Sequence, residues 1–484
     1  MQTFTAKTFC VNKDKICEIE VIACLDYKVI PVFTIIGIPP TLAKDLKVKI
    51  KAIFKQLRIK FPAGRLTIEF KNNKIDYSRA KLGFVVFALV YAFKSNSLNA
   101  FDYFYGDFDL KNNLTADVLS TIFAIENPLK KIAAGRCDLK AFFKITPNNI
   151  FLFDDCRTFL DHKNGKDLVF RYQFARNFEK KNALKINQIE GQSYAKRAVQ
   201  IAVAGWHNLM IWGETGRGKT LLAESLYELL PEPDFGESAK IIKQKYIYEC
   251  IDYTTARPYF FADTNINKSK LFKGIVASNM GCVVLDELCE WDLSYIRKLK
   301  NVIEQKNNYE KPLFIGISNL CPCGKSTGDL NLALNEPNSF NYCTCLPSAK
   351  LRYLNKLSQS FLERFSMEIN VSEYDSEQSH LSKGNLINLD IISSVSKIQK
   401  ERFKNELFRF NNFIPHISLD LFCKFSGEAK KIIEDLSFRY NISKRKLHNL
   451  KRVCRTIADL ESSEMVKDSH VFEAMLYFDF KKDS

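Results

Sequence analysis

The sequence predicts an α/β protein, and three patterns along the chain support this fold class. Over the first ~160 residues, segments with period-two apolar alternation at 17–24 and 65–70 flank a stretch with the 3.6-residue periodicity of an amphipathic helix. From residue 191 to about 371, short apolar strands alternate with helical segments, which is typical of a parallel sheet covered by helices. From about 386 to 480 the pattern is helical throughout. We therefore expect an N-terminal α+β domain at 1–160, a polar linker at 161–187, a central α/β domain at 188–375 and a helical C-terminal domain at 386–484.

Composition and charge narrow the class of protein. A chain of 484 residues with 46% hydrophobic content has enough apolar material for several packed cores, which excludes a disordered protein. Its 71 Lys and Arg against 55 Asp and Glu give a net charge of +16. This charge favours an acidic partner, nucleic acid before membrane, but an ordinary solvated lysine-rich surface explains it as well.

The N-terminus and the apolar runs indicate a cytoplasmic protein. Residues 1–10 lack the charged start and apolar core of a signal peptide. The longest apolar run, at 82–93, is about twelve residues and is too short to span a bilayer, so we expect a buried helix there and no membrane partner. In a reducing compartment the 14 cysteines are expected as free thiols or metal ligands; Cys10, Cys17 and Cys24 are expected to be buried in strands.

A basic helix is predicted after Pro39-Pro40, with Thr41 as its N-cap. Its apolar stripe consists of Leu42, Leu46, Ile50, Ile53 and Leu57, and its other face carries Lys44, Lys47, Lys49, Lys51, Lys55 and Arg58. This face is either a solvated surface, which we favour, or a nucleic-acid surface.

The most specific signal is a phosphate-binding loop in the central domain. It reads Gly213-Glu214-Thr215-Gly216-Arg217-Gly218-Lys219-Thr220, follows an apolar strand at 208–212 and opens a helix. Strand, loop and helix form the context that the pattern G-x-x-x-x-G-K-T needs. Its glycines let backbone N–H groups surround the phosphates of ATP, while Lys219 reaches the outer phosphates and Thr220 ligates Mg²⁺.

Two further strands supply the residues that ATP hydrolysis needs. The apolar strand at 282–285 ends in Asp286-Glu287, where the first carboxylate is expected to hold Mg²⁺ and the second to polarise the attacking water. The strand at 313–317 is followed by Asn319, which could orient that water beside the γ-phosphate. The sequence therefore predicts an intact hydrolytic site.

The chain also resembles the magnesium-chelatase-like AAA+ ATPases, and within them the ComM/YifB branch. The resemblance covers nearly the whole sequence, and no single motif carries it. In the N-terminal part it rests on Phe33-Thr34-Ile35-Ile36-Gly37-Ile38-Pro39 and Ile59-Lys60-Phe61-Pro62. Further along it rests on Gly191-Gln192, Leu285-Asp286-Glu287-Leu288, Asn319 with Cys321-Pro322-Cys323-Gly324, Cys343-Thr344-Cys345, Leu362-Glu363-Arg364-Phe365 and Arg455-Thr456-Ile457-Ala458-Asp459-Leu460.

This resemblance implies a homo-oligomeric ring, expected to be a hexamer, that uses ATP to remodel branched or double-stranded DNA in recombination or natural transformation. It implies Arg364 as the arginine finger that completes the neighbouring subunit's site, and Arg445 as the sensor arginine of the helical lid. It also implies a ribosomal-S5-like N-terminal domain, the fold of the Lon proteolytic domain. Protease activity is not expected, because no small-residue turn surrounds the candidate serine, Ser78.

Two cysteine pairs predict a structural zinc site. Cys321 and Cys323 are separated by one proline, and Cys343 and Cys345 by one threonine, within a loop at 321–345 rich in Gly, Pro and Asn. Four thiolates suit tetrahedral Zn²⁺ and leave no open position for catalysis. Free cysteines in a loop are the alternative.

A second basic segment lies near the C-terminus. Residues 439–455 hold seven basic side chains and no acid, and Leu447, Leu450, Cys454 and Ile457 form an apolar stripe. We expect one amphipathic helix with a cationic outer face that meets either phosphates or solvent; the pattern does not decide between them.

The sequence departs from the family at both loops expected to face the ring pore. Residues 257–263 lack the paired histidines of the family. Two segments are also shorter than in the family, the one from 263 to Gly281 and the one from Glu304 to Leu313. Glu214 and Thr215 also stand where relatives usually have two prolines. A second hypothesis therefore stays open, in which the chain is a chaperone-like ATPase of the magnesium-chelatase or MoxR type that remodels a protein complex.

Overall fold

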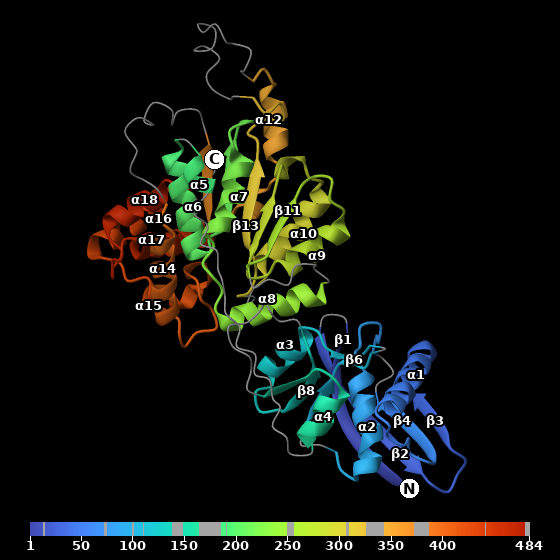
Figure 1. Cartoon of the computed structure of the whole chain (residues 1–484). Coiled ribbons are helices and arrows are strands. Elements are labelled where there is room, and N and C mark those ends of the chain that lie inside the picture. The colour runs from blue at the N-terminus through green and yellow to red at the C-terminus, as the bar shows by residue number, and fades with distance from the viewer. Residues whose placement is uncertain are drawn as a thin grey trace. The chain divides into compact units, whose positions relative to one another are not determined.

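The chain divides into two units, and each of them is made of two separate stretches of sequence (Figure 1). The computed structural model describes residues 1–12, 15–71, 75–98, 101–109, 111–137, 149–163, 185–189, 191–248, 256–305, 309–325, 343–371, 387–440 and 442–479. The first unit is Met1–Phe178 with Asp234–Thr255, and the second is Glu179–Pro233 with Ala256–Ser484. Most of the expected linker, and residues 326–342 of the expected zinc loop, lie outside the described residues.

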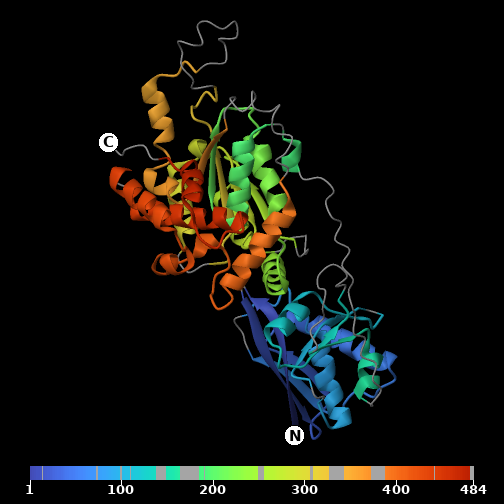
Figure 2. The ribbon, with the colours of Figure 1, turned by 90° about the vertical axis from the view of Figure 1, so that its left-hand side faces the viewer.

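A mixed sheet of seven strands organises the first unit, in the order β3-β4-β2-β1-β5-β8-β9. The antiparallel β1–β2 hairpin is its longest part and is dark blue in Figures 1 and 2. The strands are β1 Gln2–Asn12, β2 Lys15–Asp26, β3 Val32–Ile36, β4 Arg65–Lys71, β5 Tyr103–Tyr105, β8 Ile132–Gly135 and β9 Ile150–Phe153, with a small pair β6 Asp107–Phe108 and β7 Leu114–Thr115. The strands predicted at 17–24 and 65–70 are therefore confirmed, whereas the ribosomal-S5-like fold stays a prediction.

Helices cover both faces of this sheet. They are α1 Pro40–Gln56, α2 Gly83–Ser95, α3 Leu119–Glu126, α4 Cys156–Lys163 and α8 Phe235–Ile247. The buried side chains of α1 and α2 pack in one apolar cluster, and those of α3 and α8 in another. Since β1 contributes Cys10 to the first cluster and Phe9 and Val11 to the second, the two clusters lie on opposite faces of the sheet.

The predicted start of the basic helix was wrong by two residues, because its N-cap position is Pro39 and not Thr41. α1 begins at Pro40, and Pro39 precedes it without a side-chain cap, so Thr41 lies inside the first turn. Proline is suited to this first position because its φ is already helical and its missing N–H would have no partner there. The apolar stripe is confirmed in its centre, where Leu46, Ile50 and Ile53 are buried.

Helix α8 joins the first unit although its sequence lies within the expected central domain. The Tyr246 hydroxyl donates to Asp117 Oδ2 at 2.9 Å, and the Tyr105 hydroxyl donates to Asp117 Oδ1 at the same distance. The Arg79 guanidinium donates to the Tyr246 carbonyl at 2.6 Å and lies over the Tyr246 ring. Residues 234–255 thus belong to a different unit from the strands on either side of them.

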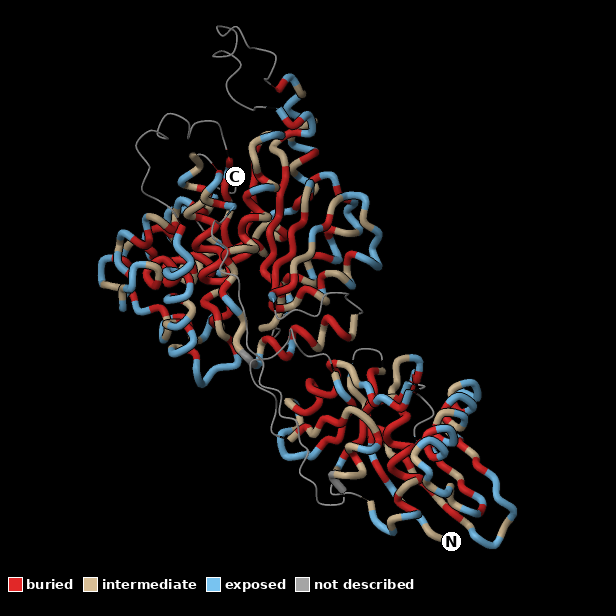
Figure 3. Tube along the Cα trace, viewed as in Figure 1, coloured by how far each residue is buried: buried red, intermediate tan, exposed pale blue. Residues whose placement is uncertain are grey.

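The second unit is built on a parallel sheet of five strands in the order β11-β12-β13-β10-β14. The strands are β10 Leu209–Gly213, β11 Tyr259–Ala262, β12 Cys282–Leu285, β13 Leu313–Ser318 and β14 Met367–Val371. The helices around it are α5 Lys185–Gln188, α6 Ser193–Gly205, α7 Lys219–Leu229, α9 Lys268–Ala277, α10 Leu293–Glu304, α12 Pro347–Leu354 and α13 Gln359–Leu362. β10, β12 and β13 are buried along their whole length (Figure 3), which confirms the three apolar strands predicted around the phosphate loop.

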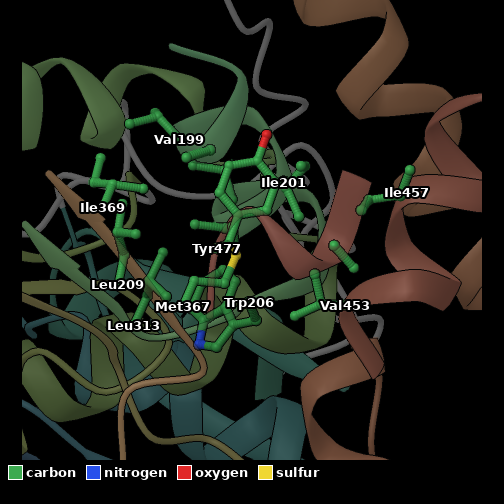
Figure 4. Close-up of a cluster of buried hydrophobic side chains, with 14 of the residues drawn as sticks. Val199, Ile201, Trp206, Leu209, Leu313, Met367, Ile369, Val453, Ile457 and Tyr477 are labelled. Carbon is green, nitrogen blue, oxygen red and sulfur yellow. The ribbon is translucent and has the colours of Figure 1, made fainter. Parts of the chain in front are cut away.

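The C-terminal helices share their core with this sheet. They are α14 Leu389–Arg402, α15 Leu419–Phe422, α16 Gly427–Tyr440, α17 Lys444–Leu460 and α18 Asp468–Met475. One apolar cluster joins Trp206 after α6, Leu209 of β10 and Met367 of β14 to Val453 of α17 and to Tyr477 (Figure 4). The helical part and the parallel sheet therefore form one packed unit.

The expected single basic helix at 439–455 was wrong. α16 ends at Tyr440 and α17 begins at Lys444, where the Ser443 hydroxyl caps the new helix by accepting from the Lys446 amide. Arg452 donates to the Ile414 carbonyl, and Arg455, only 1% exposed, forms an ion pair with Asp459. Arg452 therefore ties α17 to the segment at Ile414, Arg455 is buried against its own helix, and neither lies on an outer cationic face.

None of the described helices is both long enough and apolar enough to cross a bilayer. The apolar run at 82–93 forms α2, whose side chains are almost all buried, as predicted.

Candidate nucleotide-binding site

Three neighbouring strands of the second unit end in the predicted nucleotide-binding residues. β12, β13 and β10 are adjacent and parallel, so their carboxyl ends lie along one edge of the sheet. Asp286 follows β12, Asn319 follows β13, and the phosphate loop, residues 213–220, follows β10. Open parallel sheets bind their ligands at this edge.

Lys219 lies at the centre of the site. As the first residue of α7, its ammonium group donates to the Asn319 side-chain oxygen at 2.9 Å and to the carbonyl oxygens of Gly213 and Glu214 at 3.1 and 2.6 Å. Burial lowers the pKa of the ammonium group below its ordinary value. The structure thus brings together Lys219 and Asn319, two residues that were predicted to act at the γ-phosphate.

Thr220 and the acidic pair lie beside this lysine. The Thr220 hydroxyl donates to Asp286 Oδ2 at 3.2 Å, which brings together the two side chains that were predicted to hold Mg²⁺. Glu287 is exposed and has a left-handed backbone, with φ 53°. For a residue other than glycine this conformation costs on the order of 1 kcal/mol, and strain of this kind is common at functional sites.

The phosphate loop has the conformation that its glycines predict. Gly216 and Gly218 have φ of 82° and 76°, in the left-handed region that favours glycine. Arg217 forms an ion pair with Glu214 at 3.0 Å, and Gln192 Nε2 donates to the Arg217 carbonyl at 3.1 Å. The Thr215 amide donates to the carbonyl of Gly324 at 2.8 Å, so the loop is also held from outside its own strand and helix.

The two predicted arginines meet at one carboxylate. Glu304, the last residue of α10, pairs with Arg364 through one oxygen and with Arg445 through the other, the latter at 3.1 Å. Arg364 also donates to the Ser360 carbonyl, and its side chain is 8% exposed. Their roles as arginine finger and sensor stay predictions; sequence reasoning missed Glu304 because no motif marks it.

The four predicted cysteine ligands lie together. The Sγ atoms of Cys321, Cys323, Cys343 and Cys345 all lie within 4.8 Å of one another. Four thiolates around zinc, with Zn–S bonds of about 2.3 Å, bring sulfur atoms about 3.8 Å apart, so this arrangement fits a tetrahedral thiolate site. Burial raises the pKa of the Cys343 thiol, but hydrogen bonds from Cys321 and the Cys345 amide outweigh it and lower this pKa to about 7. The cluster can therefore hold a metal ion.

Ser78, the candidate serine of the first unit, contacts an acidic side chain. It is exposed, and its amide donates to Asp76 Oδ1 at 2.9 Å, a bond that lowers the pKa of that carboxyl group.

Comparison with known proteins agrees with this site. The family model described as magnesium chelatase, subunit ChlI, matches residues 185–379, and the model of its C-terminal domain matches residues 390–477. The chain belongs to the magnesium-chelatase-like AAA+ ATPases. Membership of this ATPase family implies ATPase activity with ATP and Mg²⁺.

Relatives of nearly the same length place the chain in the ComM/YifB branch of these magnesium-chelatase-like ATPases. Competence protein ComM of Haemophilus influenzae is 24% identical, with 92% of each chain covered. Uncharacterized protein YifB of Escherichia coli is also 24% identical, with 93% of this chain and 92% of YifB covered. An uncharacterized protein of Mycobacterium tuberculosis is 28% identical over a shorter stretch, 39% of this chain and 40% of its own.

Proposed function

We propose that this protein is a ring-forming ATPase that couples ATP hydrolysis to remodelling of branched or double-stranded DNA. The observation that carries the ATPase part is the direct contact of Lys219 with Asn319 and of Thr220 with Asp286 at one sheet edge. The DNA part is supported by the similarity, over almost the full length, to a relative named a competence protein, since competence is the uptake of DNA.

The residues of the site take distinct roles in hydrolysis. Lys219 neutralises charge that develops on the outer phosphates, and Asn319 holds the lysine in place and orients the water. Thr220 and Asp286 would hold Mg²⁺, which supplies charge neutralisation to the phosphates when bound. Glu287, exposed at the strand end beside Asp286, accepts the proton of the attacking water.

The proposed role of Arg364 requires an assembly of several copies, and the family resemblance makes a hexameric ring the form that we propose. An arginine finger acts on the nucleotide of the neighbouring subunit, so hydrolysis would need assembly. Within one chain Arg364 is paired with Glu304 and is largely buried, and we propose that assembly releases it toward the neighbouring site.

The basic face of α1 is the proposed DNA-contacting surface. Lys44, Lys51, Lys55 and Arg58 are exposed, whereas Lys49 pairs with Asp107 at 3.3 Å. Lysines without a rigid partner can neutralise DNA phosphates and release counterions. With Arg452 and Arg455 engaged inside the C-terminal helices, α1 is the stronger of the two basic segments that the sequence predicted.

The test is ATPase activity with and without forked and double-stranded DNA, on protein whose oligomeric state is measured by light scattering. We expect a hexamer with nucleotide, stimulation by DNA, and loss of stimulation as salt rises. The double variant Lys51→Glu with Lys55→Glu should lose most of the stimulation and keep basal activity. Lys430→Glu with Lys431→Glu, at exposed positions on α16, is the matched control and should behave as the wild type.

If the protein hydrolyses ATP but DNA does not stimulate this activity at low salt, the DNA part of the proposal is contradicted and the ATPase part is not. Stimulation by a folded protein client in its place would favour the chaperone-like hypothesis.

A further inference from the structure

We infer that the four-cysteine cluster is a positioning part of the nucleotide site and sets the affinity of the phosphate loop for nucleotide through Gly324. This inference rests on the nucleotide-binding part of the proposed function and is independent of the DNA part.

One backbone hydrogen bond joins the cluster to the loop. The Gly324 carbonyl accepts from the Thr215 amide at 2.8 Å, and the Gly324 amide in turn donates to the Cys321 carbonyl at 3.0 Å. A proline at position 215 would have no N–H to donate. This hydrogen bond therefore forms because the phosphate loop has Thr215 at that position.

Gly324 fits only as glycine. Its φ of +69° lies in the left-handed region, and a Cβ at this position would lie 2.1 Å from the Thr215 hydroxyl oxygen. The cysteine segment and the phosphate loop are therefore in close contact, and any displacement of one must displace the other.

The same segment also carries Asn319. This residue precedes Cys321 by two positions and accepts from the Lys219 ammonium at 2.9 Å. The chain from 319 to 324 thus touches the phosphate loop at two points, at Lys219 and at Thr215. β13 fixes the beginning of this chain segment, and the cysteine cluster is what fixes its end.

Cys343 closes the cluster from a separate part of the chain. Its Sγ lies 3.1 Å from that of Cys321, and it is buried. A metal ion held by the four thiolates would tie the end of the 319–324 segment to the stretch that begins at 343. Its effect on nucleotide binding would be purely positional, since four protein ligands leave no site for a phosphate.

The test measures the affinity for a fluorescent ADP analogue and the metal content in the same samples. Cys343→Ser should lose the metal and weaken ADP binding about tenfold, and Gly324→Ala should keep the metal and weaken binding by a similar factor. The matched controls are Cys24→Ser, in a strand of the first unit, and Gly427→Ala, where a Cβ meets nothing within 4 Å. Both should bind ADP and metal as the wild type does.

A second measurement covers the case that Cys343→Ser fails to fold. Wild-type protein stripped with a zinc-selective chelator should lose the same affinity and regain it when zinc is added back, with circular dichroism showing that the fold persists. Metal-free protein that binds ADP as tightly as loaded protein overturns the inference, as does wild-type affinity in Gly324→Ala. If the wild type itself binds no ADP, the proposed nucleotide site fails instead.

Discussion

The carboxylate of Glu304 provides the sharpest test of how the second unit is stabilised. It accepts hydrogen bonds from both Arg364 and Arg445, and Glu304→Gln removes its charge while keeping its size and one acceptor oxygen. The Arg364 side chain is 8% exposed, so its positive charge would lose its partner in a largely desolvated position.

The size of the effect follows from these two contacts. A hydrogen bond to a charged group in a buried setting contributes about 1.5–3 kcal/mol, which applies to the Arg364 contact. The Arg445 contact, with both side chains about one third exposed, adds well under about 1 kcal/mol. We expect Glu304→Gln to lower the free energy of unfolding of this unit by about 2–3 kcal/mol at pH 7.

The pH dependence has a definite sign. Burial raises the pKa of Glu304, but the hydrogen bond from Arg364 and the charges of both arginines outweigh this effect. The pKa of Glu304 in the folded protein is therefore below its ordinary value of 4.5. The stabilisation is therefore complete above about pH 4.5 and is lost as the pH falls through the lowered folded-state pKa. The wild type and Glu304→Gln should converge in stability in acid.

Tryptophan fluorescence measures this unit alone, because the 3 tryptophans of the chain, Trp206, Trp212 and Trp291, all belong to it. Urea unfolding at pH 7 and at decreasing pH should show the difference and its convergence. Glu401→Gln is the control, since Glu401 pairs with Lys404 on the surface and its loss should change little. A Glu304→Gln protein within about 0.5 kcal/mol of the wild type at pH 7, or a difference independent of pH, would refute the reasoning.

Three more predictions concern the catalytic base Glu287, the docking of α8 and a buried histidine. Glu287→Gln should reduce ATP turnover by about a hundredfold or more while leaving ADP affinity within about threefold, in steady-state and binding assays; unchanged turnover would mean that another group activates the water. Tyr246→Phe removes one of the two hydroxyl groups on Asp117 and should raise amide hydrogen exchange in α8, with a cost of about 1 kcal/mol; unaltered exchange would show that this bond does not hold the helix. Burial lowers the pKa of His207 from 6.5 to about 3. As the pH falls below about 6.5, this histidine takes up a proton in the unfolded chain but not in the folded one, so the second unit should lose stability. Stability that stays constant from pH 7 to pH 5 in the tryptophan-fluorescence assay would contradict this.

Local patterns were enough to predict the strands and the nucleotide site. β10, β12 and β13 are continuous apolar runs, and the polar residues that end them must meet at one edge once the strands are parallel. The phosphate loop carries its conformation in its own glycines. For this reason the placement of Lys219, Asp286 and Asn319 could be predicted from the sequence.

Contacts between distant parts of the chain could not be predicted in the same way. Arg455 was expected on an outer face, although Asp459, four residues later, could have indicated the buried ion pair that the structure shows. Glu304 and Arg445 are in contact although 141 positions separate them in the sequence, and 129 positions separate Tyr246 from Asp117. Periodicity identifies the buried side of a helix but not the unit that covers it, so the docking of α8 was not predicted.

The position of α8 also sets the order in which the protein can fold during synthesis. The last residues of the first unit are those up to Thr255 and not those up to Phe178, because Ala239, Ile242 and Tyr246 belong to one of its two apolar clusters. A ribosome must therefore make β10, the phosphate loop and α7 of the second unit before the first unit can close. A fragment cut after residue 178 would expose the side chains on α3 and β1 that these residues cover, and it should aggregate unless residues 234–255 are supplied.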